Sequence, residues 1–223
     1  MGILYIIATP IGNLKDITIR ALEILKEADL IVCEDTRQTI KLLNHYGISN
    51  PLISYYQHSK FSRIREIADH LNDGKKLALV TDAGTPGIAD PGNKLIFELK
   101  KILGDDFRVV PIPGPNAAVA ALSVSGLPAD RFTFLGFPPQ KKGRDSFFEK
   151  ISVLEHTAVF YESSHRIIKA MEKLNELMPE RETIVCRELT KMFESIYRGT
   201  PKEILQKLNE SANNLKGEFV IVL

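Results

Sequence analysis

Three short segments of the sequence combine carboxylates with cations, and each follows an apolar run that predicts a strand. CEDTRQT, YESSHRI and CRELTK carry these groups: Glu34, Asp35, Arg37, Glu162, His165, Arg166, Arg187, Glu188 and Lys191. A carboxylate at a strand end can accept a proton as a general base, and Glu34 or Asp35 is the candidate. A guanidinium or ammonium group can hold a phosphate, so Arg37, Arg166 and Lys191 are candidate contacts to nucleic acid.

These residues also have ordinary structural interpretations. Asp35 and Ser164 are suited to cap helices, and Glu34 and Arg37 have the spacing of an i,i+3 ion pair on a helix surface. For any one residue this interpretation carries about the same weight as a catalytic one. Because all three clusters follow strands, the sequence favours a functional site at a sheet edge.

The sequence contains no Ser-His-Asp order, and its histidines lack the close pairing of a zinc site. They are scattered at His45, His58, His70, His156 and His165. No metal is therefore expected. A further basic segment, PPQKKGRDSF, places Lys141, Lys142 and Arg144 on a predicted loop. This loop is either a solvated turn or an arm that contacts RNA.

The segment VTDAGTPGIADPG, residues 80–92, is poor in side chains, and Asp82 and Asp90 are its only charged residues. A P-loop needs a lysine directly after its last glycine, and the dinucleotide pattern needs G-x-G-x-x-G; the segment has neither. Pro86 and Pro91 remove two N–H donors that a phosphate cradle would use. The expected ligand is therefore neutral or zwitterionic, although glycine and proline can also simply shape a turn.

Three other loops share this low-charge character, and each follows a predicted strand. They are ATPIGN (residues 8–13), PIPGPNAA (residues 111–118) and LGFPP (residues 135–139). In open α/β sheets, ligands bind outside the carboxyl ends of the strands. The loops are therefore expected to line one site.

Alternation of apolar runs with helical periodicity predicts the elements that position these loops. Strands are expected at residues 3–8, 30–33, 52–55, 77–81, 108–112, 132–136, 157–161, 183–187, 195–198 and 218–223. Helices are expected near residues 17–28, 36–46, 59–71, 93–103, 117–125, 144–154, 164–177 and 201–209. Thr200, Pro201 and Glu203 form a capping-box signature. A Pro-rich segment near Gly114 interrupts the alternation of strands and helices. It predicts two α/β domains, residues 1–114 and 115–223.

The bulk properties are those of an ordinary globular protein. Of the 223 residues, 44% are hydrophobic and 26% charged, and the formal net charge of +1 selects no partner. Cys33 and Cys186 lie in apolar runs, which predicts buried free thiols in a reducing cytoplasm. No apolar run reaches the ~20 residues of a membrane span. The N-terminus lacks the basic flank of a signal peptide.

In order along the chain, the motifs resemble the bacterial ribosomal RNA small-subunit methyltransferase I family of the tetrapyrrole-methylase superfamily. The matching segments are LYIIATPIGNLKDITIRALEILKEADLIVCEDTRQT, VTDAGTPGIADPG, PIPGPNAAVAAL, GFPP, YESSHRI, CRELTK and KGEFVIVL. The resemblance implies two α/β domains of the class III S-adenosylmethionine methyltransferase type, with the cofactor cleft between them. It also implies a homodimer that methylates the ribose 2′-oxygen of a cytidine in the decoding region of 16S rRNA in the small (30S) ribosomal subunit.

The resemblance also assigns the cofactor contacts. In the first domain and the connecting loop they are Pro10, Gly84, Thr85, Pro86, Ile88, Ala89, Asn116 and Ala117. In the second domain they are Tyr161, Leu189, Gly217 and Glu218. S-adenosylmethionine carries no phosphate, which explains why residues 80–92 lack the lysine of a P-loop. Methyl transfer relies on positioning, and a ribose hydroxyl gains from a base or a cation. The catalytic candidates are then Asp35, Glu34, Arg37, His165 and Arg166.

Two alternatives stay open. One is methylation of a small tetrapyrrole; ATPIGN argues against it, because porphyrin and corrin methylases carry a G-x-G-x-G-D-like stretch there. The other is a non-catalytic RNA-binding module that retains the fold. Members of the resembled family continue past GEF into a basic helical extension, whereas this sequence ends at Leu223. RNA affinity supplied by that extension is not expected of these residues.

Overall fold

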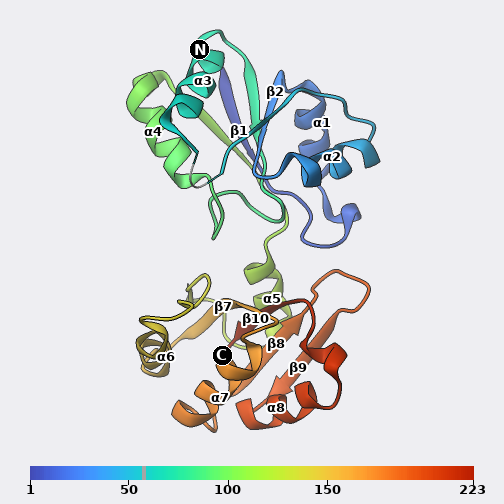
Figure 1. Ribbon diagram of the computed structural model, residues 1–223, viewed down its shortest axis with the longest axis vertical. Helices are drawn as coiled ribbons and strands as arrows, with labels where there is room; N and C mark the ends of the chain where they lie inside the picture. The colour runs from blue at the N-terminus through green and yellow to red at the C-terminus, as the bar shows by residue number, and fades with distance from the viewer. Residues whose placement is uncertain (57–58) are drawn as a thin grey trace. The chain divides into compact units, whose positions relative to one another are not determined.

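A computed structural model describes residues 1–56 and 59–223, so His58 lies outside the described residues. The chain divides into two compact units, Met1–Asn116 and Ala117–Leu223 (Figure 1). We call them the first and second units. Each consists of a sheet with helices packed on it.

The first unit contains a parallel sheet with the strand order β3-β2-β4-β1-β5. The strands are β1 (Ile3–Ile7), β2 (Leu30–Cys33), β3 (Leu52–Ser54), β4 (Lys76–Leu79) and β5 (Arg108–Ile112). The helices are α1 (Ile19–Glu27), α2 (Thr36–His45), α3 (Phe61–Asn72) and α4 (Asn93–Leu103), with short 3₁₀ turns η1 (Leu14–Asp16) and η2 (Gly104–Asp106).

Both faces of this sheet are covered, as its nearly continuous apolar strands require. Residues from α1 and α2 form one apolar cluster with the sheet, and residues from α3 and α4 form the other. Figure 1 shows the two helix pairs on opposite sides of the sheet. The carboxyl ends of all its strands therefore lie at one edge, where the loops that follow β1, β2, β4 and β5 begin.

The second unit contains a mixed sheet with the strand order β6-β7-β10-β8-β9. The strands are β6 (Phe132–Phe134), β7 (Thr157–Ser163), β8 (Thr183–Arg187), β9 (Ser195–Gly199) and β10 (Glu218–Val222). β6 and β7 are parallel, whereas the other pairs are antiparallel. The helices are α5 (Ala117–Ser125), α6 (Arg144–Ser152), α7 (Ile167–Leu177) and α8 (Pro201–Asn209), with the 3₁₀ turn η3 (Ala212–Leu215).

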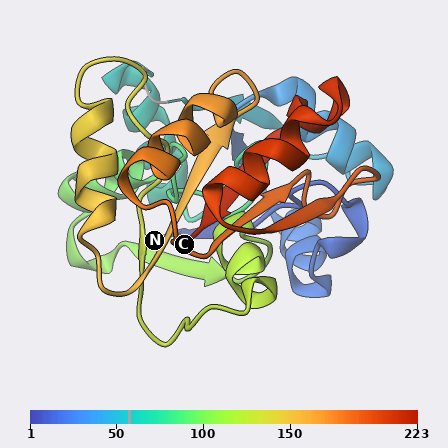
Figure 2. The same ribbon diagram turned by 90° about the horizontal axis from the view of Figure 1, so that it is seen from below.

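Helices also cover both faces of the second sheet. α6, α7 and α8 share a large apolar cluster with one face, and α5 packs on the other. Figure 2 shows α7, in orange, beside α8, in red, in agreement with the contacts between them. The Thr200 hydroxyl accepts from the Glu203 N–H while the Glu203 carboxylate accepts from the Thr200 N–H, so the predicted capping box is confirmed.

The structure confirms the kind of every predicted element and corrects several ends. α7 begins at Ile167, and its N-cap position is Arg166, so the prediction that Ser164 caps this helix is wrong. Arg166 forms an ion pair with Glu162 at 2.9 Å, and its backbone N–H donates to the Ser163 carbonyl in a turn that precedes the helix. Cys33 and Cys186 are buried free thiols, as predicted. Burial raises the pKa of both thiols, that of Cys186 to about 11.

Candidate functional site

Loops that follow three strands of the first unit are joined by hydrogen bonds. Thr9, after β1, and Gly84, after β4, form an isolated antiparallel bridge with N···O distances of 2.9 and 3.0 Å. The Thr85 hydroxyl donates to the carbonyl of Pro115, after β5, at 3.1 Å. The prediction that these loops meet at the carboxyl edge of the sheet is confirmed for the first unit.

The loop at residues 80–92 has glycine where a side chain would not fit. Gly87 has a φ of +82°, and a Cβ there would lie 2.6 Å from the side-chain oxygen of Asn93. Ala89 also adopts a left-handed conformation, with a φ of +62°. Such a backbone costs roughly 1–3 kcal/mol in a non-glycine residue and is typical of ligand loops. Ile88 and Ala89, two of the predicted cofactor contacts, are exposed, whereas Pro86 is buried.

Carboxylates gather at the same sheet edge, around Thr81. The Thr81 hydroxyl donates to Glu34 at 2.9 Å, and Asp82 accepts from the backbone N–H of Asp35 at 3.1 Å. Burial, and then the charge of Glu34, raises the pKa of Asp90 to about 6, against the effect of a hydrogen bond with Thr81. Burial also raises the pKa of Asp82. Asp90 can therefore exchange a proton near neutral pH.

Asp35 caps α2. Its carboxylate accepts from the backbone N–H of Arg37 at 2.9 Å and from the Arg37 guanidinium at 2.6 and 3.0 Å. The capping interpretation is thus confirmed, whereas the ion pair predicted between Glu34 and Arg37 is wrong, because Arg37 pairs with Asp35 instead. Hydrogen bonds from Arg37 lower the pKa of Asp35 to about 2. Such a carboxylate is a weak base at neutral pH, and its part in catalysis stays a prediction.

In the second unit, three predicted cofactor contacts come together. Ala117, Tyr161 and Leu189 are partly buried and pack against one apolar cluster. The hydroxyl of Tyr161 accepts a hydrogen bond from the backbone N–H of Ala118 at 3.3 Å. This bond ties the end of β7 to the first turn of α5.

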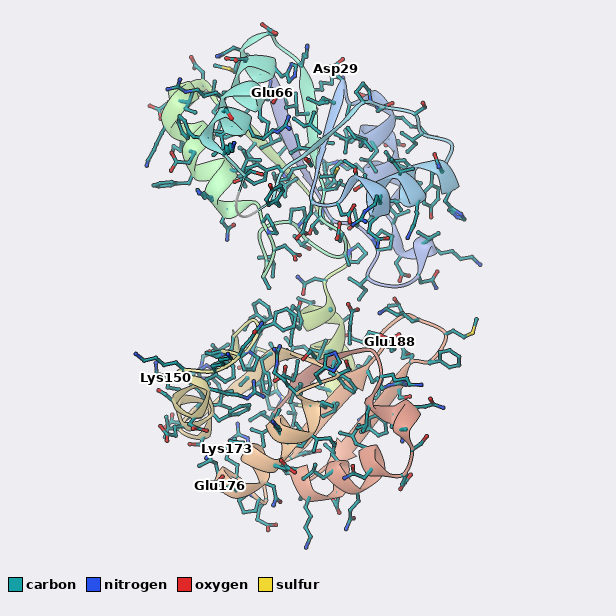
Figure 3. All side chains as sticks on the ribbon, viewed as in Figure 1. Asp29, Glu66, Lys150, Lys173, Glu176 and Glu188 are labelled. Atoms are coloured by element: carbon teal, nitrogen blue, oxygen red, sulfur yellow. The ribbon has the colours of Figure 1, made fainter. Side chains whose placement is uncertain are left out.

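Gly217 and Glu218 contact the loop that follows β8. Glu188, labelled in Figure 3, accepts from the backbone N–H of Glu218 at 2.9 Å. Lys191 donates to Glu188 at 2.8 Å and to Glu218 at 2.7 Å. A Cβ at Gly217 would lie 2.5 Å from the Glu188 side chain, so glycine is required there. Glu188 and Thr190 are left-handed, with φ values of +52° and +67°, which marks this loop too as strained.

The YESSHRI cluster separates in the structure. The Glu162 side chain is fully buried and accepts from Arg144 at 2.7 Å and from Arg166 at 2.9 Å. His165, in contrast, is exposed. Glu162 therefore orients two guanidinium groups, and it is Arg144 rather than His165 that completes the cluster.

Arg187 has a structural role. Its side chain is buried and donates to the main-chain carbonyls of Lys216, Phe193 and Asn213 at 2.7, 2.9 and 2.7 Å. These bonds hold the loop after β8 and the turn before β10 in place. A guanidinium engaged in this way supports the site rather than contacting a phosphate.

The structure also limits other chemistry. Within residues 1–56 and 59–223, no group of three or more His, Cys, Asp or Glu side chains is placed to hold a metal ion. Over the same described residues, helices fall short of the length and apolarity that crossing a membrane requires.

Comparison with known proteins defines the class first. A family model described as Tetrapyrrole (Corrin/Porphyrin) Methylases matches residues 3–205, and the chain belongs to this family. Solved structures agree on the fold. A diphthine synthase superposes with a TM-score of 0.73 at 14% identity, covering 100% of this chain and 90% of its own. A cobalt precorrin-4 methyltransferase gives 0.68 at 20% identity, covering 99% and 94%.

The particular family follows from closer relatives. The ribosomal RNA small subunit methyltransferase I of Halalkalibacterium halodurans is 46% identical, over 100% of this chain and 75% of its own length. The proteins of the same name from Bacillus subtilis and Escherichia coli O157:H7 are each 44% identical, over 100% of this chain and 75% and 77% of theirs. The chain belongs to the ribosomal RNA small subunit methyltransferase I family.

Methyltransferases of the tetrapyrrole methylase family use S-adenosylmethionine, and the residues at the first-unit edge fit this cofactor. Its sulfonium and ammonium groups are cations, and the edge presents Glu34, Asp82 and Asp90. Residues 80–92 contain no lysine or arginine that would favour a phosphate instead. The side-chain-poor, partly strained backbone lets a ligand approach the main chain.

Asp90, whose pKa is raised at this edge, is not among the site residues predicted from the sequence. In the sequence it is one of two charged residues in an otherwise uncharged loop. That contrast is a usable signal, because charged side chains stand out in a loop otherwise built from small and apolar residues. Its neighbour Glu34 follows β2, and only the adjacency of β2 and β4 in the sheet brings the two together.

Proposed function

We propose that this chain transfers a methyl group from S-adenosylmethionine to the ribose 2′-oxygen of a cytidine in 16S rRNA. The observation that carries the proposal is identity of 44–46% over the whole chain to ribosomal RNA small subunit methyltransferases I. A whole-chain match at this level includes both units and every loop described above. It favours an RNA substrate over the small tetrapyrroles of more distant members of the fold.

The cofactor contacts are assigned to loops of both units. In the first unit, they are Pro10, Gly84, Thr85, Pro86, Ile88, Ala89 and Asn116. In the second unit, they are Ala117, Tyr161, Leu189, Gly217 and Glu218. The hydrogen bonds that join Thr9 to Gly84 and Thr85 to Pro115 support the first set, because they hold its loops together. When bound, the cofactor supplies an electrophilic methyl group with a good leaving group.

We assign Asp90 as the proton acceptor because of its raised pKa. Attack by a 2′-hydroxyl releases a proton, and a general base works best with a pKa near the working pH. The pKa of Asp90 is about 6, because the group is half-buried beside Glu34. The pKa of Asp35 is about 2, because Arg37 binds its carboxylate. Asp35 and Glu34 then act by positioning, Asp35 by holding Arg37 and Glu34 by keeping Asp90 basic.

The cations are assigned to the RNA backbone. Arg166 is fixed by Glu162, and Arg37 by Asp35, so both present guanidinium groups in defined orientations. Lys191 already bridges two carboxylates and is a weaker candidate. His165 is exposed and is assigned to RNA contact rather than proton transfer.

A homodimer in the cytoplasm completes the proposal. Light scattering at micromolar concentration would show a mass twice the 25.0 kDa of the chain. A monomer that is fully active would contradict this part alone. The two buried thiols are consistent with a reducing compartment.

The decisive experiment is transfer of a radiolabelled methyl group to small ribosomal subunits from a strain that lacks this protein. Digestion to nucleosides should place the label on 2′-O-methylcytidine. Label on a base, or on another ribose, would contradict the proposed substrate. Cofactor binding with no transfer to subunits or free 16S rRNA would instead support a non-catalytic RNA-binding module.

A further inference from the structure

The segment between β6 and α6 and the segment after β7 form a surface with an excess of positive charge. Residues 135–144 and 164–171 contain no aspartate or glutamate. Their cationic side chains are Lys141, Lys142, Arg144, Arg166 and Lys169, to which His165 adds a titratable ring. Both segments follow neighbouring parallel strands, so they begin at the same end of the sheet.

Hydrogen bonds anchor the loop between β6 and α6. The Gly136 carbonyl accepts from the Tyr161 N–H at 2.8 Å, and the Lys141 carbonyl accepts from the Arg144 N–H at 3.2 Å. The Arg144 side chain contacts the Pro139 carbonyl at 3.4 Å. Lys141 and Lys142 therefore extend from a fixed turn, and both are exposed.

A buried carboxylate sets the orientation of the two arginines. Glu162 has no exposed side-chain surface, whereas Arg144 and Arg166 keep 16% and 25% of theirs. One negative charge shared by two positive ones leaves a net positive charge at the surface. Arg166 donates to Glu162 through Nε at 2.9 Å.

An aromatic ring stands at the start of the same loop. Phe137 is 53% exposed, and its ring packs against the edge of Tyr161 at a centroid distance of 5.3 Å and an interplanar angle of 62°. Tyr161 is held in turn by its bond with Ala118. A supported, half-exposed ring beside fixed cations is the combination that binds single-stranded nucleic acid, in which bases stack on aromatics and cations track the phosphates.

We propose that Phe137, Lys141, Lys142, Arg144 and Arg166 form the docking surface for single-stranded RNA, with a base stacked on Phe137 and phosphates on the cations. We call these five residues the RNA surface. The proposal rests on the proposed function, since it names the part of the chain that holds the RNA substrate. Tyr161 is also a proposed cofactor contact, which links the two binding events through one side chain.

The chain contains a matched control on α4. Phe97, Lys100 and Lys101 repeat an exposed aromatic followed by two adjacent lysines, and Phe97 is 60% exposed. There, Lys101 lies over the Phe97 ring and beside Glu98, so the charge is locally balanced. The same substitutions in the two places separate an effect of the RNA surface from an effect of net charge or apolar area.

The first test measures binding of a fluorescein-labelled single-stranded RNA oligonucleotide, and of small ribosomal subunits, over a range of salt concentrations. Lys141→Gln with Lys142→Gln should weaken binding and reduce the slope of log affinity against log salt by about 1.4, for two phosphate contacts. Lys100→Gln with Lys101→Gln should leave affinity and slope at the wild-type values.

The second test addresses stacking. Phe137→Ala should weaken RNA binding roughly 5- to 150-fold, with the salt slope unchanged. Phe137→Trp should restore binding, and Phe97→Ala should have no effect. Melting temperatures of all variants should match the wild type, because the substituted side chains are exposed.

The outcomes distinguish this surface from the proposed function. Wild-type affinity in both the lysine and the phenylalanine variants would overturn the RNA surface, even if the wild-type chain methylates subunits. Loss of RNA binding in these variants, with no methyl transfer by the wild type, would uphold the surface and overturn the methyltransferase proposal. Failure of the wild-type chain to bind either RNA probe would overturn the surface.

Discussion

The loops that follow the strands carry opposite charge in the two units. The first-unit edge carries Glu34, Asp82 and Asp90 around the hydroxyl of Thr81. The segments that follow β6 and β7 in the second unit carry cations, and the neighbouring carboxylate of Glu162, near the end of β7, is buried and pairs with Arg144 and Arg166. The first-unit edge gathers carboxylates, whereas the second-unit segments have more positive charge than Glu162 can neutralise.

This difference shows how the neighbouring groups determine the role of a carboxylate. Burial, and then the charge of Glu34, raises the pKa of Asp90 to about 6, so the group can accept a proton. Between two arginines, Glu162 serves as an anchor that orients cations. The first arrangement suits proton transfer and the second suits holding a phosphate backbone, which is the division of work that an RNA methyltransferase needs.

The largest expected effect is on cofactor binding. Thr85→Arg should abolish binding of S-adenosylmethionine, because a long cationic side chain would fill the loop and remove the bond from Thr85 to Pro115. Thr85→Ser retains the hydroxyl and should bind normally. Isothermal calorimetry compares the two. Unchanged affinity in the arginine variant would remove this loop from the cofactor site.

The second expected effect is on turnover. Asp90→Asn should lower the single-turnover rate by roughly 10²–10⁴-fold, the usual contribution of a general base, with cofactor affinity retained. In the wild type, the rate should rise with pH through about 6, as Asp90 loses its proton. A wild-type rate that is flat across this range would argue against Asp90 as the base.

Asp90→Asn should lower turnover but stabilise the folded protein above pH 6. The folded-state pKa of Asp90 lies above that of an unfolded aspartate, so the native state binds the additional proton between about pH 4 and 6. Stability contributed by this group therefore falls as pH rises through that window. Asp90→Asn removes the charge and should raise the melting temperature above pH 6. A lower melting temperature there would show that the carboxylate has a stabilising partner.

The third expected effect is on folding of the second unit. Glu162→Ala leaves two largely buried guanidinium groups without a counter-charge, which should cost about 3 kcal/mol of unfolding free energy. Urea denaturation measures this loss. As a control, Glu176→Ala breaks an exposed pair with Lys173, both labelled on α7 in Figure 3, and should change stability little. Equal effects of the two substitutions would show that Glu162 is not an anchor.

The smallest expected effect separates the roles of Asp35. Asp35→Ala should lower the melting temperature by roughly 2–4 °C through loss of the α2 cap, while the single-turnover rate stays within a few-fold. Asp35→Asn retains a capping oxygen and should restore most of the stability. A large loss of rate in the stable Asn variant would return Asp35 to the catalytic role predicted from the sequence.

Local sequence determined the elements and the character of their loops. Apolar runs such as LIVC placed β2, helical periodicity placed α4, and Thr200 with Glu203 specified the start of α8. These features were predictable because backbone conformation and capping depend on neighbouring residues. The same reasoning anticipated that loops after β1, β4 and β5 meet, since the strands of a parallel sheet end at one edge.

Tertiary structure decided which side chains became partners. Glu34 follows β2 and Asp90 follows β4, and the pairing of these strands adds the charge of Glu34 to the burial that raises the pKa of Asp90. Glu162 pairs with Arg144, at the start of α6, as well as with Arg166, although the sequence segment YESSHRI contains only His165 and Arg166 beside it. Periodicity determines which face of an element is buried, but it carries no record of strand order or of which charges meet across a sheet edge. Those depend on the packing of the whole unit, and the pKa values follow from that packing.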